Sequence, residues 1–353
     1  MTMTPLLAAV MGAALVLYVL LGGADYGAGF WNLLTFGPLR EEQKGLIANA
    51  IRPIWEANHV WLIFIFVLLF AGFPRAFGAI MIALYVPISL VLLGIVLRGA
   101  AFVFQAYSTS SDVQRTYAFL FSASSSFTPM LAGIVLASLS DDRVVVVRDE
   151  SLNGYVFNWL NLFSVAVGLL TLALCAYLAA TYLAVEAPSP ELRQAFRRRA
   201  FASGSISGVL AVEVLILTNR YAHSLRAALL HNGLALFAEA VAVSSLIVGL
   251  VALYKDHLRF ARLMVALFAA SILTSWVAAL YPYLARPDMT IFNSALSENV
   301  VRDVLYVSIA GAVVLFPSLA LLLYVFKDQR QQPLFVAMRP AATLAGSPTS
   351  HSE

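Results

Sequence analysis

The sequence predicts an all-α, polytopic membrane protein, and three observations lead to this fold class. The chain of 353 residues is 61% hydrophobic and only 12% charged, whereas soluble domains usually have about 25% charged residues. Its mean hydropathy is +0.85. Apolar runs recur from residue 5 to residue 326, and many approach the roughly 20 residues that a helix needs to cross a bilayer. No water-soluble fold buries that much apolar surface.

The apolar runs divide into nine expected spans, separated by polar segments or by proline and glycine. They cover residues 5–36, 54–72, 76–106, 116–139, 157–185, 200–219, 229–253, 260–281 and 302–326. The first run is longer than the core of a signal peptide, so it is expected to stay as the first helix. Only residues 72–75 separate spans two and three, which predicts an antiparallel hairpin.

One integral-membrane domain is expected over residues 1–327, followed by a polar cytoplasmic tail at 328–353. Helices one to four occupy about 5–139, helices five to eight about 157–281, and helix nine about 302–326. Basic loops stay on the cytoplasmic side of a membrane. The loops that follow the odd-numbered spans, together with the tail, carry about twice as many Lys and Arg residues as the opposite face. The N-terminus is therefore predicted outside and the C-terminus in the cytoplasm.

Composition also excludes several kinds of site. The net charge of +3 is small and scattered, unlike the basic surface that binds nucleic acid. Cys175 is the only cysteine, so the chain has no internal disulfide and no thiolate cluster, and no metal site is expected. Of the five histidines, three lie at or near span ends and one lies in the tail, so only His59 is a candidate for a position well inside a span. Bis-histidine haem ligation is therefore not expected, although a single His/Met site stays open.

Ionisable groups at membrane depth are costly and are the first candidates for function. Asp25 lies in span one, within the segment GGADYGAG at 22–29, whose small residues allow a neighbouring helix to approach closely. The alternative places Asp25 at the helix end, in water. The predicted topology puts Asp25, Glu56, His59 and Arg98 in the cytoplasmic half, at similar depth.

Span two begins with a proline, which suits the first helical position and places Glu56 near the first turn. A carboxylate there is equally well explained as a partner of the helix dipole or as a proton carrier. His59, one turn later, suits either a proton relay or ordinary packing. Trp55 and Trp61 also fit the role of interfacial anchors.

Three further charged residues lie well inside spans, away from their ends. Arg98 in span three either pairs with Asp25 or Glu56, or extends its long side chain to the interface. Glu213 and Glu239 fall in the outer half of spans six and seven. A structural role, contact with a partner subunit and a second polar path all remain open for these two acids.

The residues above resemble subunit II of the cytochrome bd quinol oxidases. The match covers residues 15–106 and rests on the segment 22–29, on the block PIWEANHVWLI at 53–63, and on Arg98. The family typically has W-D-G-N where this chain has Trp55, Glu56, Ala57 and Asn58. The acidic side chain is kept but is one methylene longer, and the glycine is replaced by alanine. These two differences affect the geometry of a proton path rather than whether such a path exists.

The resemblance implies two four-helix bundles plus a peripheral helix, paired with a similar subunit I in the bacterial inner membrane, with a periplasmic N-terminus. Subunit I would hold haems b558, b595 and d and oxidise quinol, while this chain binds no haem. A structural quinone, an oxygen route through the apolar interior and a small single-helix subunit are further expectations. Site residues carried over are the proton path Glu56, Asp25 and His59, with Trp55, Asn58, Trp61 and Arg98 in support.

The expected function is therefore that of a haem-free partner in a complex that oxidises quinol and reduces O2 to water. Protons taken from the cytoplasm, with quinol protons released outside, generate a gradient without pumping. A proton-coupled secondary transporter is the main alternative, because buried acids beside glycine-interrupted helices also suit substrate sites. A second acidic glycine-rich segment would favour the transporter, but spans five to eight contain none. A purely structural scaffold for another oxidoreductase is the third possibility.

Overall fold

The computed structural model describes residues 3–51, 55–108, 110–142 and 158–328, and this part of the chain is almost entirely helical. The all-α prediction is confirmed. The helices are α1 (Met3–Leu33), α2 (Arg40–Ile51), α3 (Trp55–Gly72), α4 (Pro74–Ala83), α5 (Tyr85–Tyr107), α6 (Ser111–Ser140), α7 (Leu162–Glu186), α8 (Pro190–Tyr221), α9 (His223–His231), α10 (Gly233–Tyr254), α11 (Leu258–Leu280), α12 (Ile291–Ser294) and α13 (Glu298–Asp328). One antiparallel hairpin joins β1 (Tyr283–Ala285) and β2 (Met289–Thr290).

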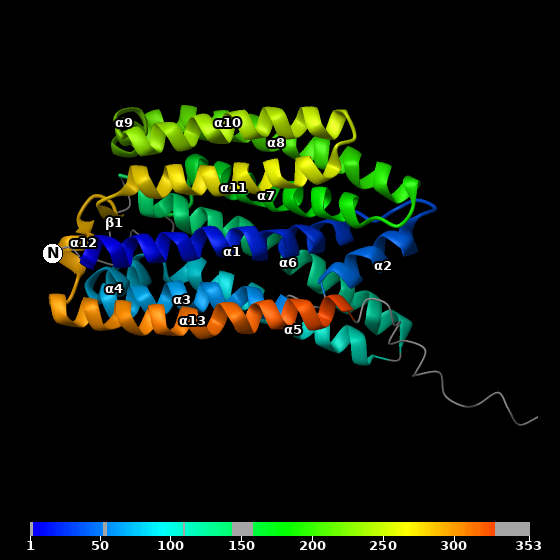
Figure 1. Ribbon diagram of the computed structural model, residues 1–353, viewed down its shortest axis with the longest axis horizontal. Coiled ribbons are helices and arrows are strands. Elements are labelled where there is room, and N and C mark those ends of the chain that lie inside the picture. Colours follow the sequence, from blue (N-terminus) through cyan, green and yellow to red (C-terminus); the bar gives the residue numbers. More distant parts are fainter. Residues whose placement is uncertain (1–2, 52–54, 109, 143–157, 329–353) are drawn as a thin grey trace, which may run out of the picture. The chain divides into compact units, whose positions relative to one another are not determined.

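Within the described residues, eight helices are long and apolar enough to cross a membrane, and a ninth span results if α3 and α4 are counted as one bent span. This agrees with the polytopic architecture predicted from the apolar runs. The N-terminal end of α1 lies at the same end of the structure as α4, α9 and α12, and α2 lies at the other end (Figure 1). Which end faces the cytoplasm stays a prediction from the loop charges.

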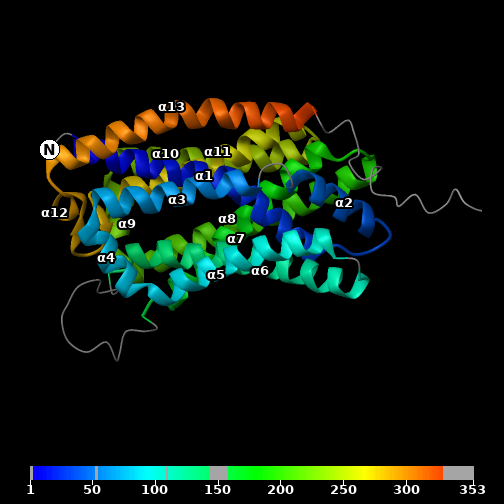
Figure 2. The ribbon, with the colours of Figure 1, turned by 90° about the horizontal axis from the view of Figure 1, so that it is seen from below.

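The chain turns where the hairpin between spans two and three was predicted, but the two spans do not form a simple hairpin, because the separate helix α4 lies between α3 and α5. The axes of α3 and α4 differ by 118°, and α4 connects α3 to α5 (Figure 2). Pro74 starts α4 at a position where its missing N–H is not needed, and Leu84 interrupts the helix before α5 begins. As a result α3 packs along α1, whereas α5 packs along α6.

A second boundary also differs from the prediction. The span expected at 229–253 begins with the end of the separate helix α9, and α10 starts only at Gly233. Asn232 causes this break, because its side chain accepts hydrogen bonds from the backbone N–H groups of Leu234 and Ala235. Such a cap satisfies donors that have no partner within the helix.

Helices α1 and α7 form the centre of the first compact unit, Met1–Ile309, and α7 contributes the largest share of buried residues to the core. The Trp31 indole N–H of α1 donates a buried hydrogen bond to the Ala176 carbonyl of α7 at 2.8 Å. A Cβ atom on Gly27 would overlap the carbonyl of Cys175. The helix that Gly23 and Gly27 allow to approach closely is therefore α7.

The second compact unit is Ala310–Glu353, and its described part is the helical segment that ends at Asp328. Nearly all of the predicted polar tail, residues 329–353, lies outside the described residues. The division between a membrane domain and a tail therefore stays a prediction.

Candidate functional site

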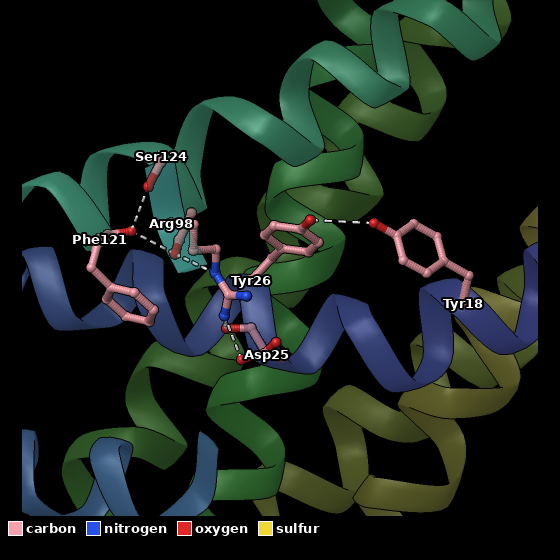
Figure 3. Close-up of polar contacts among 7 residues, drawn as sticks. Tyr18, Asp25, Tyr26, Arg98, Phe121 and Ser124 are labelled. Atoms are coloured by element: carbon pink, nitrogen blue, oxygen red, sulfur yellow. Dashed lines mark hydrogen bonds and ion pairs between the residues drawn. The ribbon is translucent and has the colours of Figure 1, made fainter. Parts of the chain in front are cut away.

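A buried ion pair joins the first and third predicted spans. The Arg98 Nη2 of α5 lies 2.5 Å from the Asp25 Oδ1 of α1, and each side chain is 1% exposed (Figure 3). Arg98 therefore does not extend to the interface, and Asp25 is not a solvated end residue. Because a lone charge at membrane depth costs about 2.5–3.5 kcal/mol on insertion scales, the two groups are expected to depend on each other.

The guanidinium of Arg98 is enclosed on several sides. Its Nε donates to the Ser125 hydroxyl of α6 at 2.8 Å, and its carbon lies 4.8 Å from the ring centroid of Tyr26 and 5.0 Å from that of Phe121. Ser125 in turn donates to the Phe121 carbonyl at 2.6 Å. A Cβ atom on Gly29 would overlap the Ser125 side chain, so this glycine provides the space for the contact.

Ser125 and Phe121 were not among the predicted site residues. A signal was present, because the segment FSASSSF at 121–127 interrupts an apolar span with four serines. Serine is easily accommodated in a membrane helix by bonding to a carbonyl one turn earlier. The pattern therefore does not show which of the serines bonds to another helix.

Helix α3 brings two more polar side chains to this face of α1. Asn58 is 3% exposed and lies beside Gly22, whose added Cβ would be 3.8 Å from the Asn58 Cβ. The His59 ring centroid lies 6.5 Å from that of Tyr18 and 6.2 Å from that of Tyr26. The hydroxyl oxygens of the two tyrosines are 3.3 Å apart.

Three polar atoms at this contact are buried without a hydrogen-bond partner in the described part of the chain: Asp25 Oδ2, Asn58 Nδ2 and His59 Nδ1. An unsatisfied buried polar group costs about 1–3 kcal/mol, and ordered water commonly satisfies such groups. The α1–α3 contact thus has unused donors and acceptors beside the ion pair, which suits a water molecule or a proton in transit.

The remaining predicted residues have different outcomes. Trp61 is 4% exposed, so it packs inside the protein and is not a lipid-facing anchor. The side chains of Trp55 and Glu56 lie outside the described residues, and the position of Glu56 in a proton path stays a prediction. Glu213 is exposed on α8 and Glu239 is partly buried on α10, and their roles remain open.

An apolar groove of about 690 Å³ lies between α3 and α5. Its walls include Phe66 and Phe70 of α3 and Leu92 of α5, and Tyr18 and Tyr26 also line it. Because Tyr26 also contacts the Arg98 guanidinium, the apolar groove extends to the side chains that surround the ion pair.

The fold and site define an integral-membrane helical protein that holds a buried carboxylate–guanidinium pair between several of its spans. The family model described as "Cytochrome bd terminal oxidase subunit II" matches residues 3–326. The chain belongs to this family. The match extends well beyond residues 15–106, on which the resemblance in the sequence rests.

Individual relatives agree with this assignment. The putative cytochrome bd menaquinol oxidase subunit II of Bacillus subtilis (strain 168) is 23% identical over 316 residues, which is 86% of this chain and 89% of that protein. The cytochrome bd-I ubiquinol oxidase subunit 2 of Escherichia coli (strain K12) is 27% identical over 177 residues, 49% of this chain and 46% of that protein. These relatives are subunits of quinol oxidases, which are oxidoreductase complexes.

The solved bd oxidase from Geobacillus thermodenitrificans contains a chain with the same fold. The TM-score is 0.76 at 22% sequence identity, and the match covers 92% of this chain and 99% of that one. The protein is thus an integral membrane protein with the fold of a bd oxidase subunit.

Proposed function

We propose that this chain is the haem-free subunit II of a quinol:oxygen oxidoreductase, where it supports a haem-bearing subunit I and conducts protons from the cytoplasm for O2 reduction. Family membership supports the oxidase assignment. The observation that carries the proton path is the buried Asp25–Arg98 pair beside unsatisfied atoms of Asn58 and His59.

Reducing O2 to water consumes protons inside the membrane, so a chain of proton-binding groups must reach the aqueous surface. Glu56 is proposed as the entry, His59 as a relay one turn further along α3, and Asp25 as the inner group. Arg98 binds Asp25 Oδ1 and leaves Oδ2 to exchange a proton with bridging water. Because Arg98 is held by Ser125 and by two aromatic rings, it fixes this carboxylate in place.

The rings of Tyr18 and Tyr26 lie 6.5 and 6.2 Å from the His59 imidazole, which supports a packing or relay role for this histidine. Following the resemblance, we assign haems b558, b595 and d, and quinol oxidation, to subunit I. A structural quinone and a small single-helix subunit complete the proposed complex, with a periplasmic N-terminus and a cytoplasmic C-terminus.

Glu56→Gln removes the titrating proton with little change of shape. In the purified complex it is expected to slow oxygen consumption by about tenfold or more, since a positioned proton carrier typically contributes at least about a hundredfold. Glu56→Asp should retain much of the rate, because the family typically has the shorter acid. Oxygen consumption per haem, measured with an oxygen electrode, checks both variants.

Asp25→Asn is the companion variant, because its amide oxygen can still accept from Arg98. It should slow turnover while haem content stays normal. Unchanged rates for both Glu56→Gln and Asp25→Asn, between about pH 6 and pH 9, would rule out the path and leave Glu56 as a partner of the helix dipole.

His59→Ala tests the assignment of the haems to subunit I. The complex carrying this substitution should keep its full set of haem absorption bands, because no axial ligand is removed. Reduced-minus-oxidised spectra of the purified complex, normalised to protein, measure this. Loss of any one haem signal in His59→Ala, but not in Asn58→Ala, would contradict the assignment.

A further inference from the structure

A basic surface lies where α7 ends, α8 begins and α10 turns into α11. Two contacts bring these elements together. The Arg197 Nη1 of α8 lies 3.0 Å from Asp256 Oδ1 in the α10–α11 turn, and the guanidinium carbon of Arg262 in α11 lies 4.7 Å from the ring centroid of Tyr182 in α7. Both turns lie at the end of the structure away from the N-terminus (Figure 1).

Six cationic side chains make up this basic surface: Arg193, Arg197, Arg198, Lys255, Arg259 and Arg262. All except the half-buried Arg197 are exposed. Residues three or four apart on a helix share a face, as do Arg193 with Arg197 and Arg259 with Arg262. The same turns contain only three acids, Glu186, Glu191 and Asp256, and Asp256 is already bound by Arg197. The surface is therefore strongly positive.

Exposed apolar side chains border the basic surface on the same helices. Phe201 of α8 is 44% exposed, and Phe260 and Leu263 of α11 are 48% and 61% exposed. Tyr254, at the end of α10, is 78% exposed. Tyrosine beside basic residues is typical of the boundary between lipid headgroups and the hydrocarbon, and Tyr254 beside Lys255 fits this pattern.

We propose that the basic surface binds the phosphate headgroups of anionic phospholipids, whose acyl chains then lie along Phe201, Phe260 and Leu263. Guanidinium groups suit this ligand because they bind phosphate oxygens with two parallel hydrogen bonds. Basic residues next to membrane helices attract anionic lipids. The apolar border favours a lipid over free phosphate, because only a lipid contacts both kinds of surface at once.

The test uses the complex purified through a tag on this chain and reconstituted in nanodiscs of phosphatidylglycerol and phosphatidylethanolamine at equal proportions. Native mass spectrometry then counts each lipid that stays bound. The unmodified complex should retain phosphatidylglycerol in excess. Arg193→Gln, Arg259→Gln and Arg262→Gln together should reduce this excess by about tenfold or more. The corresponding three Lys substitutions keep the charge but not the paired hydrogen bonds, so they should retain more of the excess than the Gln substitutions.

The matched control removes three positive charges at the other end of the structure, with Arg75→Gln, Arg226→Gln and Arg302→Gln. This variant should retain the phosphatidylglycerol excess. The proposal is overturned if the unmodified complex shows no preference, or if the two Gln triples lose it equally. Added inorganic phosphate that displaces the lipid completely at millimolar concentration would also contradict it. If the complex with the three Gln substitutions in the basic surface does not assemble, the salt dependence of the unmodified complex serves as the test. A phosphatidylglycerol excess that does not weaken as the salt concentration rises would refute the electrostatic site.

Discussion

Arg98→Leu is expected to destabilise the protein by about 3–5 kcal/mol, because it leaves a buried carboxylate without its cationic partner. Both side chains of the Asp25–Arg98 pair are only 1% exposed, so water cannot replace the lost interaction without reorganisation. The same change also removes the bond to Ser125. Thermal unfolding of the purified complex, followed by loss of haem absorption and by circular dichroism, measures the effect.

A double-mutant cycle separates pairing from general packing. Asp25→Asn combined with Arg98→Leu should be less destabilising than the sum of the two single changes, by about 1 kcal/mol or more, because the second substitution removes a charge already left unpaired. Arg226→Leu on the exposed surface of α9 serves as the control and should change stability by less than about 0.5 kcal/mol. Strict additivity of the two buried substitutions would show that the pair does not act as a unit.

Gly27→Ala should produce the second largest effect, although it adds only one methyl group. The new Cβ would overlap the backbone carbonyl of Cys175 and crowd the Ala179 side chain. Because backbone cannot move aside as a side-chain tip can, α1 and α7 must separate. Overpacking of this kind costs about 1–3 kcal/mol, and the displacement should also disturb Trp31, whose indole binds the Ala176 carbonyl.

Gly78→Ala provides the matched control for Gly27→Ala. Gly78 lies in α4, and an added Cβ there meets no atom within 4 Å. The same substitution should be neutral or stabilising by up to about 1 kcal/mol, since alanine is the better helix former. Equal destabilisation by both substitutions, in thermal unfolding of the complex, would show that close approach to α7 is not the reason for glycine at position 27.

Much of this architecture could be predicted, because a membrane helix must be apolar along nearly its whole length. The spans, the grouping of Asp25 with Arg98 and the need for small residues in 22–29 all follow from that constraint. The α4 segment was missed because no charged residue separates it from α5. Its separation from α5 at Leu84 depends on backbone geometry, which hydropathy does not report.

The site was predictable only in part, for a similar reason. Charges stand out in an apolar sequence, and Asp25 and Arg98 were found in this way. Ser125 and Tyr18 did not stand out, because serine and tyrosine are common in membrane helices. The role of Ser125 depends on which face of α6 meets Arg98, and that of Tyr18 depends on which face of α1 meets His59 of α3. Packing between helices sets these helix rotations.

The close contact between α1 and α7 makes Cys175 an intrinsic reporter of helix separation. It is the only cysteine of the chain, it is 3% exposed, and an added Cβ on Gly23 would lie 3.4 Å from its sulfur. Because the sulfur is buried, a maleimide is expected to react with it mainly when the surrounding helices part. Under conditions where closing outpaces modification, the labelling rate in a complex whose partner cysteines are removed measures the free energy of this local opening. The chain thus contains a single-site probe of its own local opening and needs no substitution of its own for this measurement.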